Sequence, residues 1–80
     1  MKKATQKDYT EEMAVFNDCW ALLKKYYFIG SDPAEWAAMT AEASEICQKH
    51  HFSEFANRLV HLVIDRLEYL YKERLNSQIP

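Results

Sequence analysis

The chain has few of the residues that interrupt or cross-link a fold. Its 80 residues include one glycine, two prolines and two cysteines. So little glycine and proline favours few turns and long regular elements. Two cysteines are too few for a disulfide framework, and no apolar run approaches the roughly 20 residues of a membrane-spanning helix. These absences exclude a disulfide-stabilised scaffold, and we expect no membrane association.

A strong charge of one sign is also absent. The chain has 10 Lys and Arg against 12 Asp and Glu, a net charge of -2, which offers no strong field for nucleic acid or an anionic membrane. Met1 and two lysines lead into a polar stretch rather than the apolar core of a signal peptide. We therefore expect a cytoplasmic protein.

The apolar content is high, with 49% hydrophobic and 14% aromatic residues. A chain of this size needs a dense apolar core, because a small domain buries a smaller share of its surface than a large one. We predict one helical domain over residues 1–80, with residues 1–7 and 76–80 frayed.

Apolar residues in the first part of the chain predict a helix over about residues 9–29, because their spacing alternates between four and three. Two neighbouring stripes result: Tyr9, Met13, Phe16, Trp20, Leu23 and Tyr27, and beside them Val15, Cys19, Leu22 and Tyr26. Such a wide apolar arc is expected where one helix packs against two others. We expect Asp8 or Thr10 to cap its start, and Gly30 to adopt the left-handed conformation at its end.

The stretch "SDPAEW" predicts the start of a second helix, over about residues 33–49. Asp32 is the expected cap, Pro33 suits the first helical position, and Glu35 completes a capping-box pattern. A third helix is expected over about residues 53–75, with Ser53 as its cap.

Two short connections between three helices favour antiparallel neighbours along the chain. We therefore predict an all-α fold, an up-down-up three-helix bundle. The alternative is a helical hairpin whose long third helix pairs with a second chain.

The stretch "ICQKHHFSEF" gathers Cys47, His50 and His51, residue types that bind metals. A structural zinc site normally needs four converging Cys or His ligands, and the other donors are Cys19 and His61. With helices laid side by side at about 1.5 Å of rise per residue, these donors are offset by roughly one to two turns. We interpret the stretch as a helix end and a turn. A metal-binding or small enzymatic protein using Cys47, His50 and His61 is the third hypothesis.

Catalysis by either thiol is disfavoured by its position. A reactive thiolate needs partial exposure and a positive neighbourhood, whereas Cys47 falls near a helix C-terminus and Cys19 falls inside an apolar arc. No glycine-rich phosphate loop is present. We predict that the protein is not an enzyme and has no catalytic residue, metal ligand or cofactor.

Nucleic-acid binding is the alternative function. Lys24 and Lys25 lie beside "YYF", and basic groups with aromatic rings can bind single strands. The N-terminal lysines could add a basic arm: Lys2, Lys3 and Lys7. Acidic residues along the exposed face of the third helix make it a poor reader of the major groove.

The leading hypothesis is a small non-enzymatic protein-protein interaction or regulatory module, with self-association as a homodimer one form of it. Phe28 falls outside both stripes of the first helix and is expected to project outward, and aromatic residues are enriched at interfaces. The alanine side of the second helix would let another helix approach closely. The candidate partner-binding residues are Tyr26, Phe28, Ile29, Ala34, Ala38 and Ala41. Alternatively, Phe28 and Ile29 cover the end of the bundle and the alanines reflect helix propensity.

The segment "CWALLKKYYFIGSDPAEWAAMTAEASEICQKH", followed by "FANRLVHLVIDRLEYLYK", resembles small uncharacterised all-helical proteins of Firmicutes-type bacteria and their prophages or mobile elements. The resemblance covers about residues 16–72 and includes Trp20, the helix start at Asp32 and the pair Ile46–Cys47. It implies no activity and no catalytic residue. It implies a phage-type or accessory adaptor or regulator.

Overall fold

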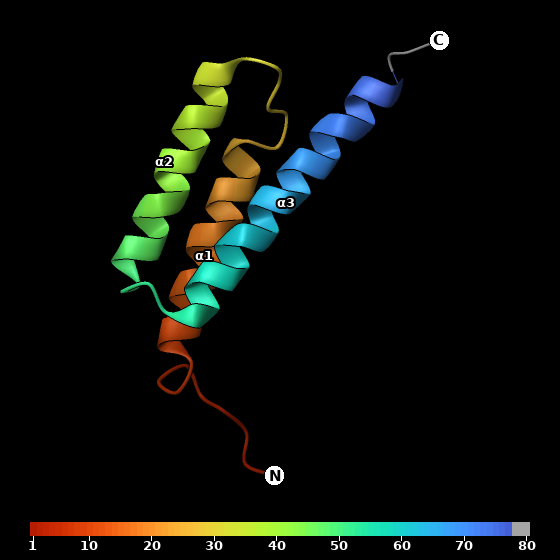
Figure 1. Cartoon of the computed structure of the whole chain (residues 1–80). Coiled ribbons are helices and arrows are strands. Elements are labelled where there is room, and N and C mark those ends of the chain that lie inside the picture. The colour runs from red at the N-terminus through yellow and green to blue at the C-terminus, as the bar shows by residue number, and fades with distance from the viewer. Residues whose placement is uncertain (78–80) are drawn as a thin grey trace.

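Three helices make up the chain in the computed structural model, which describes residues 1–77 (Figure 1). They are α1 (Thr10–Lys25), α2 (Pro33–Lys49) and α3 (Glu54–Ser77). Each helix packs against both others, and α2 runs opposite to α1 and α3 (Figure 1). This arrangement confirms the up-down-up three-helix bundle, with the third helix packed on the first two within one chain.

The core contains residues of all three helices and of the turn that follows α1. It comprises Val15, Cys19, Leu22, Tyr26, Ile29, Met39, Ala43, Cys47, Ala56, Val60 and Leu67. Only one of the two apolar stripes predicted on the first helix enters this core. Phe16 and Trp20, in the other stripe, are 53% and 58% exposed, so the wide arc is only partly covered by the two neighbouring helices.

The start of α1 differs from the prediction. Neither Asp8 nor Thr10 caps the helix: the cap position is Tyr9, which makes no side-chain cap hydrogen bond. The Asp8 carboxylate instead accepts from the Thr5 amide at 2.9 Å, and the Thr10 hydroxyl donates to the Gln6 carbonyl at 2.7 Å. Local hydrogen bonds of Asp and Thr can stabilise a turn as well as a helix start, and here they stabilise the turn before α1.

The end of α1 also differs, because the helix stops at Lys25 and not near residue 29. A turn follows, in which the Ile29 amide donates to the Tyr26 carbonyl at 2.9 Å. This turn carries Ile29 into the core. Gly30 does not adopt the left-handed conformation, so the glycine-cap prediction was wrong.

Two side chains of other helices donate to backbone carbonyls of the turn that follows α1. The Arg74 guanidinium donates to the carbonyls of Tyr27 at 3.0 Å and Ile29 at 2.9 Å. The Trp36 indole donates to the Gly30 carbonyl at 2.7 Å. Backbone carbonyls outside a helix need other partners, and these contacts join the turn after α1 to α2 and α3.

The starts of α2 and α3 follow the prediction. The Asp32 carboxylate accepts from the Ala34 amide at 2.9 Å, with Pro33 in the first helical position. The Ser53 hydroxyl accepts from the Ala56 amide at 3.2 Å. α3 continues to Ser77, so residues 76 and 77, which were expected to fray, are helical. Residues 78–80 lie outside the described part of the chain.

The turn between α2 and α3 is a Schellman motif formed without glycine. The Phe52 amide donates to the Cys47 carbonyl at 2.8 Å, and the His51 amide donates to the Gln48 carbonyl at 3.0 Å, which are the two hydrogen bonds of that motif. His51 and Phe52 have φ angles of 57° and 54°. Side chains with a Cβ adopt this left-handed region at a cost.

Glycine at position 51 is therefore expected to stabilise the protein. We predict that His51→Gly raises the free energy of unfolding by up to about 1 kcal/mol, because removing the Cβ cost outweighs the added freedom of the unfolded chain. Urea unfolding followed by circular dichroism measures the change. His51→Ala is the control, since it keeps the Cβ; an equal gain in both variants would contradict the explanation.

Across residues 1–77, every helix falls short of the length and apolarity that a membrane span demands.

Candidate functional site

A band of large apolar side chains lies along the junction of α1 and α3, and we call it the α1–α3 face. Its members are Phe16, Trp20 and Leu23 of α1 and Phe55, Leu59, Leu62 and Val63 of α3. Leu62 is 64% exposed, as prominent as Phe16 and Trp20. At the lower end of the band the rings of Phe16 and Phe55 meet edge to face, with centroids 5.6 Å apart. The band is therefore a continuous surface built by two helices.

Helix periodicity explains why this band stays uncovered. The α1 members recur at four- and three-residue intervals and so share one side of the helix. The neighbouring stripe, which contains Val15, Cys19 and Leu22, points into the core and is buried. α3 covers the boundary between the two stripes, so Leu23, Leu59 and Val63 are half-buried while the outer members face solvent.

Two shallow hollows lie within the face. Phe16, Cys19, Trp20, Leu23, Leu59 and Val63 line the first, of about 160 Å³. Leu23, Leu62, Val63 and Arg66 line the second, of about 260 Å³. The hollows share Leu23 and Val63, so they form one trough. The trough is shallow and open, whereas a small-molecule pocket encloses most of the surface of its ligand, so the trough suits the side chains of another protein better.

A cation lies beside each hollow of the trough. The Lys24 ammonium lies over the Trp20 ring, 5.6 Å from its centroid, and the Arg66 guanidinium lies over the Tyr69 ring at 4.9 Å. No ion pair within residues 1–77 involves either Lys24 or Arg66. Among residues 1–77, no acidic side chain lines either hollow. The apolar trough thus has a positive rim.

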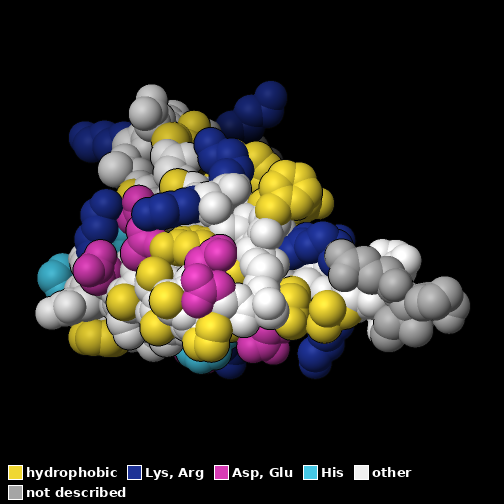
Figure 2. All heavy atoms as spheres, turned by 90° about the horizontal axis from the view of Figure 1, so that it is seen from above, with side chains coloured by type: hydrophobic (Ala, Val, Ile, Leu, Met, Phe, Trp, Pro, Cys, Tyr) yellow, Lys and Arg dark blue, Asp and Glu magenta, His cyan; other side chains and the backbone are white. Residues whose placement is uncertain are grey.

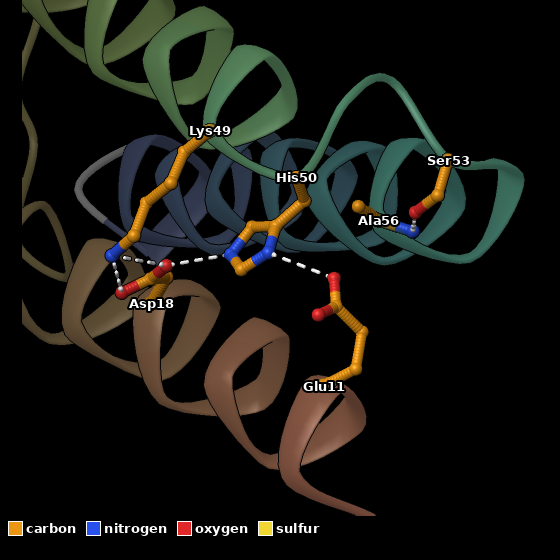
Figure 3. Close-up of polar contacts among 6 residues, drawn as sticks. All are labelled: Glu11, Asp18, Lys49, His50, Ser53 and Ala56. Atoms are coloured by element: carbon orange, nitrogen blue, oxygen red, sulfur yellow. Dashed lines mark hydrogen bonds and ion pairs between the residues drawn. The ribbon is translucent and has the colours of Figure 1, made fainter.

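A polar cluster joins α1 to the C-terminal end of α2 (Figure 3). His50, 5% exposed, lies with Nε2 2.8 Å from Asp18 Oδ2 and Nδ1 3.4 Å from Glu11 Oε1. The Lys49 ammonium reaches the same Asp18 oxygen at 3.1 Å. The ring of His50 therefore lies between two carboxylates of α1, and the cluster fixes the position of α2 on α1.

Sequence reasoning interpreted the stretch around His50 as a helix end and a turn, and it missed the partners of the His50 ring. Asp18 lies between Val15 and Leu22 at helical spacing, beside the buried stripe. This position was the one sign in the sequence that Asp18 would have a polar partner. An acid at the border of a core stripe often pairs with a polar group of the facing helix, because buried polar groups need partners. Nothing in the local pattern indicated that the facing residue would be 32 positions away.

Asp18 is expected to make stability depend on pH in the acid range. Burial alone would raise the pKa of Asp18, but hydrogen bonds from His50 and Lys49, together with their positive charge, hold it below the ordinary 3.8. The folded state then binds this proton more weakly than the unfolded chain does. The stabilisation is fully present above the unfolded pKa and is lost as the pH falls through the lower folded pKa.

We therefore predict that Asp18→Asn flattens the acid limb of the stability curve. Wild type loses stability as the pH drops below about 4, and the variant, which starts lower at pH 7, loses less over the same range. Urea unfolding at a series of pH values measures both curves. Parallel curves would show that Asp18 contributes no pH dependence. Asp65→Asn, on the exposed side of α3, is the control and should leave the wild-type slope unchanged.

A second polar contact between α1 and α2 involves Glu42. It pairs with Lys25 at 2.6 Å and accepts a hydrogen bond from the Tyr26 hydroxyl. Hydrogen bonds from Lys25 and Tyr26 hold the pKa of Glu42 below its usual value, and the bond to Glu42 raises the pKa of Tyr26. Lys25 thus contacts an acid and Lys24 contacts Trp20. The nucleic-acid hypothesis, which used both lysines, stays a prediction.

The structure divides the predicted partner-binding residues. Phe28 projects outward as predicted, at 82% exposed, and lies against Tyr27 and the Arg74 guanidinium. The three α2 alanines are exposed as well: Ala34, Ala38 and Ala41. Tyr26 and Ile29 are buried members of the core, so the folded chain does not offer their side chains to a partner. Apolar side chains at a helix end, such as these two, are as typical of core packing as of an interface.

The candidate metal ligands do not form one group. Within residues 1–77, no three or more His, Cys, Asp or Glu side chains are placed to hold a metal ion. His50 faces α1, whereas His61 is exposed and its Nδ1 contacts the Asn57 carbonyl at 2.7 Å. Burial, with the nearby charges of Asp18 and Cys47, raises the pKa of the Cys19 thiol to about 11, so Cys19 is protonated at neutral pH.

Comparisons of the chain with protein-family models, with curated proteins and with solved structures find no match. The resemblance to small helical proteins of Firmicutes-type bacteria and their mobile elements stays a prediction.

Proposed function

We propose that the protein is a small non-enzymatic protein-interaction module and that the α1–α3 face is its binding surface. The observation that carries the proposal is the clustering of Phe16, Trp20 and Leu62, each more than half exposed, in one band. Single exposed apolar residues are common on proteins, whereas a contiguous patch marks an interaction site. Aromatic side chains in such a patch are typical of binding hot spots.

The overall surface agrees with an uncovered face. The chain exposes 6197 Å², against about 5,000 Å² expected for a compact monomer of this mass. The molecule is also elongated, with extents of 54 × 27 × 18 Å, and the N-terminal segment leads away from the bundle (Figure 1). Seen end-on in Figure 2, hydrophobic side chains reach the surface at several points, with Lys and Arg side chains among them. A partner on the α1–α3 face would bury part of this area.

Affinity capture from host cells with paired variants tests the proposal. The double variant Trp20→Gln, Leu62→Gln removes the two most prominent groups of the face, and Ala38→Gln, Ala41→Gln changes the exposed side of α2 by the same chemistry. We expect a reproducible partner with wild type and the α2 variant, and its loss with the face variant. Circular dichroism checks that both variants stay folded.

Two results would contradict the proposal. One is a partner that the face variant retains, and the other is a partner that only the α2 variant loses. The second result would move the binding surface to the alanine side of α2.

A further inference from the structure

The geometry of the α1–α3 face points to one kind of occupant: an amphipathic helix of a partner protein, with acidic side chains beside its apolar stripe. This inference rests on the proposed function and names the chemistry of the partner. It draws on the shape of the trough and on the charges beside its two hollows.

The trough has the dimensions of a helix-binding groove. From Phe16 to Leu23 the trough extends about 10 Å along α1, at 1.5 Å per residue, which matches about two turns of a partner helix. The two hollows follow one another and share Leu23 and Val63, so successive apolar side chains of one helix can occupy them. Helix-in-groove recognition uses anchors at i, i+3 or i+4, and i+7 in this way.

The charges around the trough favour acidic side chains on both sides of the apolar stripe of the partner helix. Lys24 borders the α1 side and Arg66 lines the second hollow, and neither joins an ion pair with another residue in 1–77. At the lower end, Arg58 is already paired with Glu54 at 2.7 Å. The net charge of the chain is -2, so the attraction for acids is local to the trough. Complementary charge at an interface favours partners of opposite sign.

A second copy of the chain fits the same face less well. In a two-fold dimer the same patch meets itself. The Lys24 ammonium lies over Trp20, which lines the first hollow, and Arg66 lines the second, so each hollow has a cation beside it. A dimer in which the two troughs meet would bring these cations near the like charges of the copy, which disfavours association. A lipid surface also fits poorly, because a concave trough leaves its hollows unfilled against a flat bilayer.

Two synthetic peptides of about 18 residues, or five helical turns, test the inference. Both carry the same leucine stripe; one has glutamates on its flanks and the other has lysines at those positions. Titration is followed by tryptophan fluorescence, since Trp20 lies in the face, and by calorimetry. We expect the glutamate peptide to bind at least about ten-fold more tightly at low salt, with the difference shrinking as salt screens it.

Variants assign the binding to the proposed contacts. Lys24→Glu with Arg66→Glu should reverse the preference between the peptides, and Trp20→Gln with Leu62→Gln should weaken both peptides about ten-fold or more. Lys2→Glu with Lys3→Glu is the matched control for charge and should leave the ratio of the two affinities nearly unchanged. Circular dichroism and urea unfolding establish that each variant is folded before it is titrated.

Four results would overturn the inference. Equal affinity for the two peptides would contradict the acidic side chains inferred for the partner helix. Absence of binding by either peptide would contradict a helix as the occupant of the trough. A dimer in light scattering that the Trp20→Gln, Leu62→Gln variant converts to monomer makes a second copy the occupant. The last result has two parts: the protein binds phosphatidylcholine–phosphatidylserine vesicles through Leu62, and it shows no preference for the glutamate peptide. A lipid surface would then be the occupant. In the first two cases the capture experiment with host partners still decides the proposed function separately.

Discussion

Leu67→Ala is expected to lower the free energy of unfolding by about 2–5 kcal/mol, the usual cost of truncating a buried leucine. Leu67 is 0% exposed and lies in the core with Val60 and Ala56 of the same helix. A domain of this size has a total stability on the order of 4–12 kcal/mol at the usual value per residue. The substitution therefore removes a large share of the stability, and urea unfolding with circular dichroism measures it.

Leu62→Ala is the matched control, because it makes the same change five positions earlier on α3. Leu62 is largely exposed, so its truncation loses little burial, and alanine favours the helix. We expect a change of less than about 1 kcal/mol. Equal losses in the two variants would show that Leu62 is covered in solution and that the α1–α3 face is not free. A shift of the Leu62→Ala loss with protein concentration would identify self-association as the cover.

The helices themselves were predictable from the sequence because their signals are local. Asp32 with Pro33 and Ser53 with the following apolar run lie within a few residues of the groups they cap, and both caps are present. The alternation of three and four in the apolar spacing identified α1 and its two stripes. Binary pattern and capping act within one or two turns, so one chain is enough to predict them.

The choice between the two stripes of α1 was not predictable in the same way. Both stripes contain large apolar residues, and the stripe with Phe16 and Trp20 has the larger side chains. The structure buries the one with Val15 and Cys19. Smaller side chains let α2 and α3 approach α1 closely, and dense packing is worth more than the size of any one residue. Which stripe is covered depends on how three helices fit together, and no local pattern contains that information.

The contacts that complete the fold also join distant positions. Arg74 donates to the carbonyl of Tyr27, 47 residues away, and this contact joins the turn after α1 to α3. His50 and Asp18 are 32 residues apart. Long-range partners of this kind are fixed by helix packing, and the composition of either neighbourhood does not indicate them.

His50→Ala is expected to cost about 2–3 kcal/mol at pH 7. The substitution removes a buried ring together with its hydrogen bond to a carboxylate, and hydrogen bonds to charged groups contribute about 1.5–3 kcal/mol. Asp18 keeps its contact with Lys49, so the loss stays below that of a fully unpaired buried charge. Urea unfolding measures it, with His61→Ala as the control: His61 is exposed, its hydrogen bond lies within its own helix turn, and the expected loss is below about 0.5 kcal/mol.

A double-mutant cycle separates the hydrogen bond from the packing of the ring. Asp18→Ala and His50→Ala are combined, and contacting polar groups show coupling energies of about 0.5–3 kcal/mol. We expect a coupling of at least about 1 kcal/mol, because the two side chains are 2.8 Å apart and His50 is buried. A parallel cycle of Asp18→Ala with Lys49→Ala should show a smaller coupling, since the Lys49 side chain is 64% exposed and solvent screens exposed ion pairs. If the losses from Asp18 and His50 simply add, the histidine stabilises the α1–α2 contact by filling space, and the carboxylates beside it contribute nothing measurable.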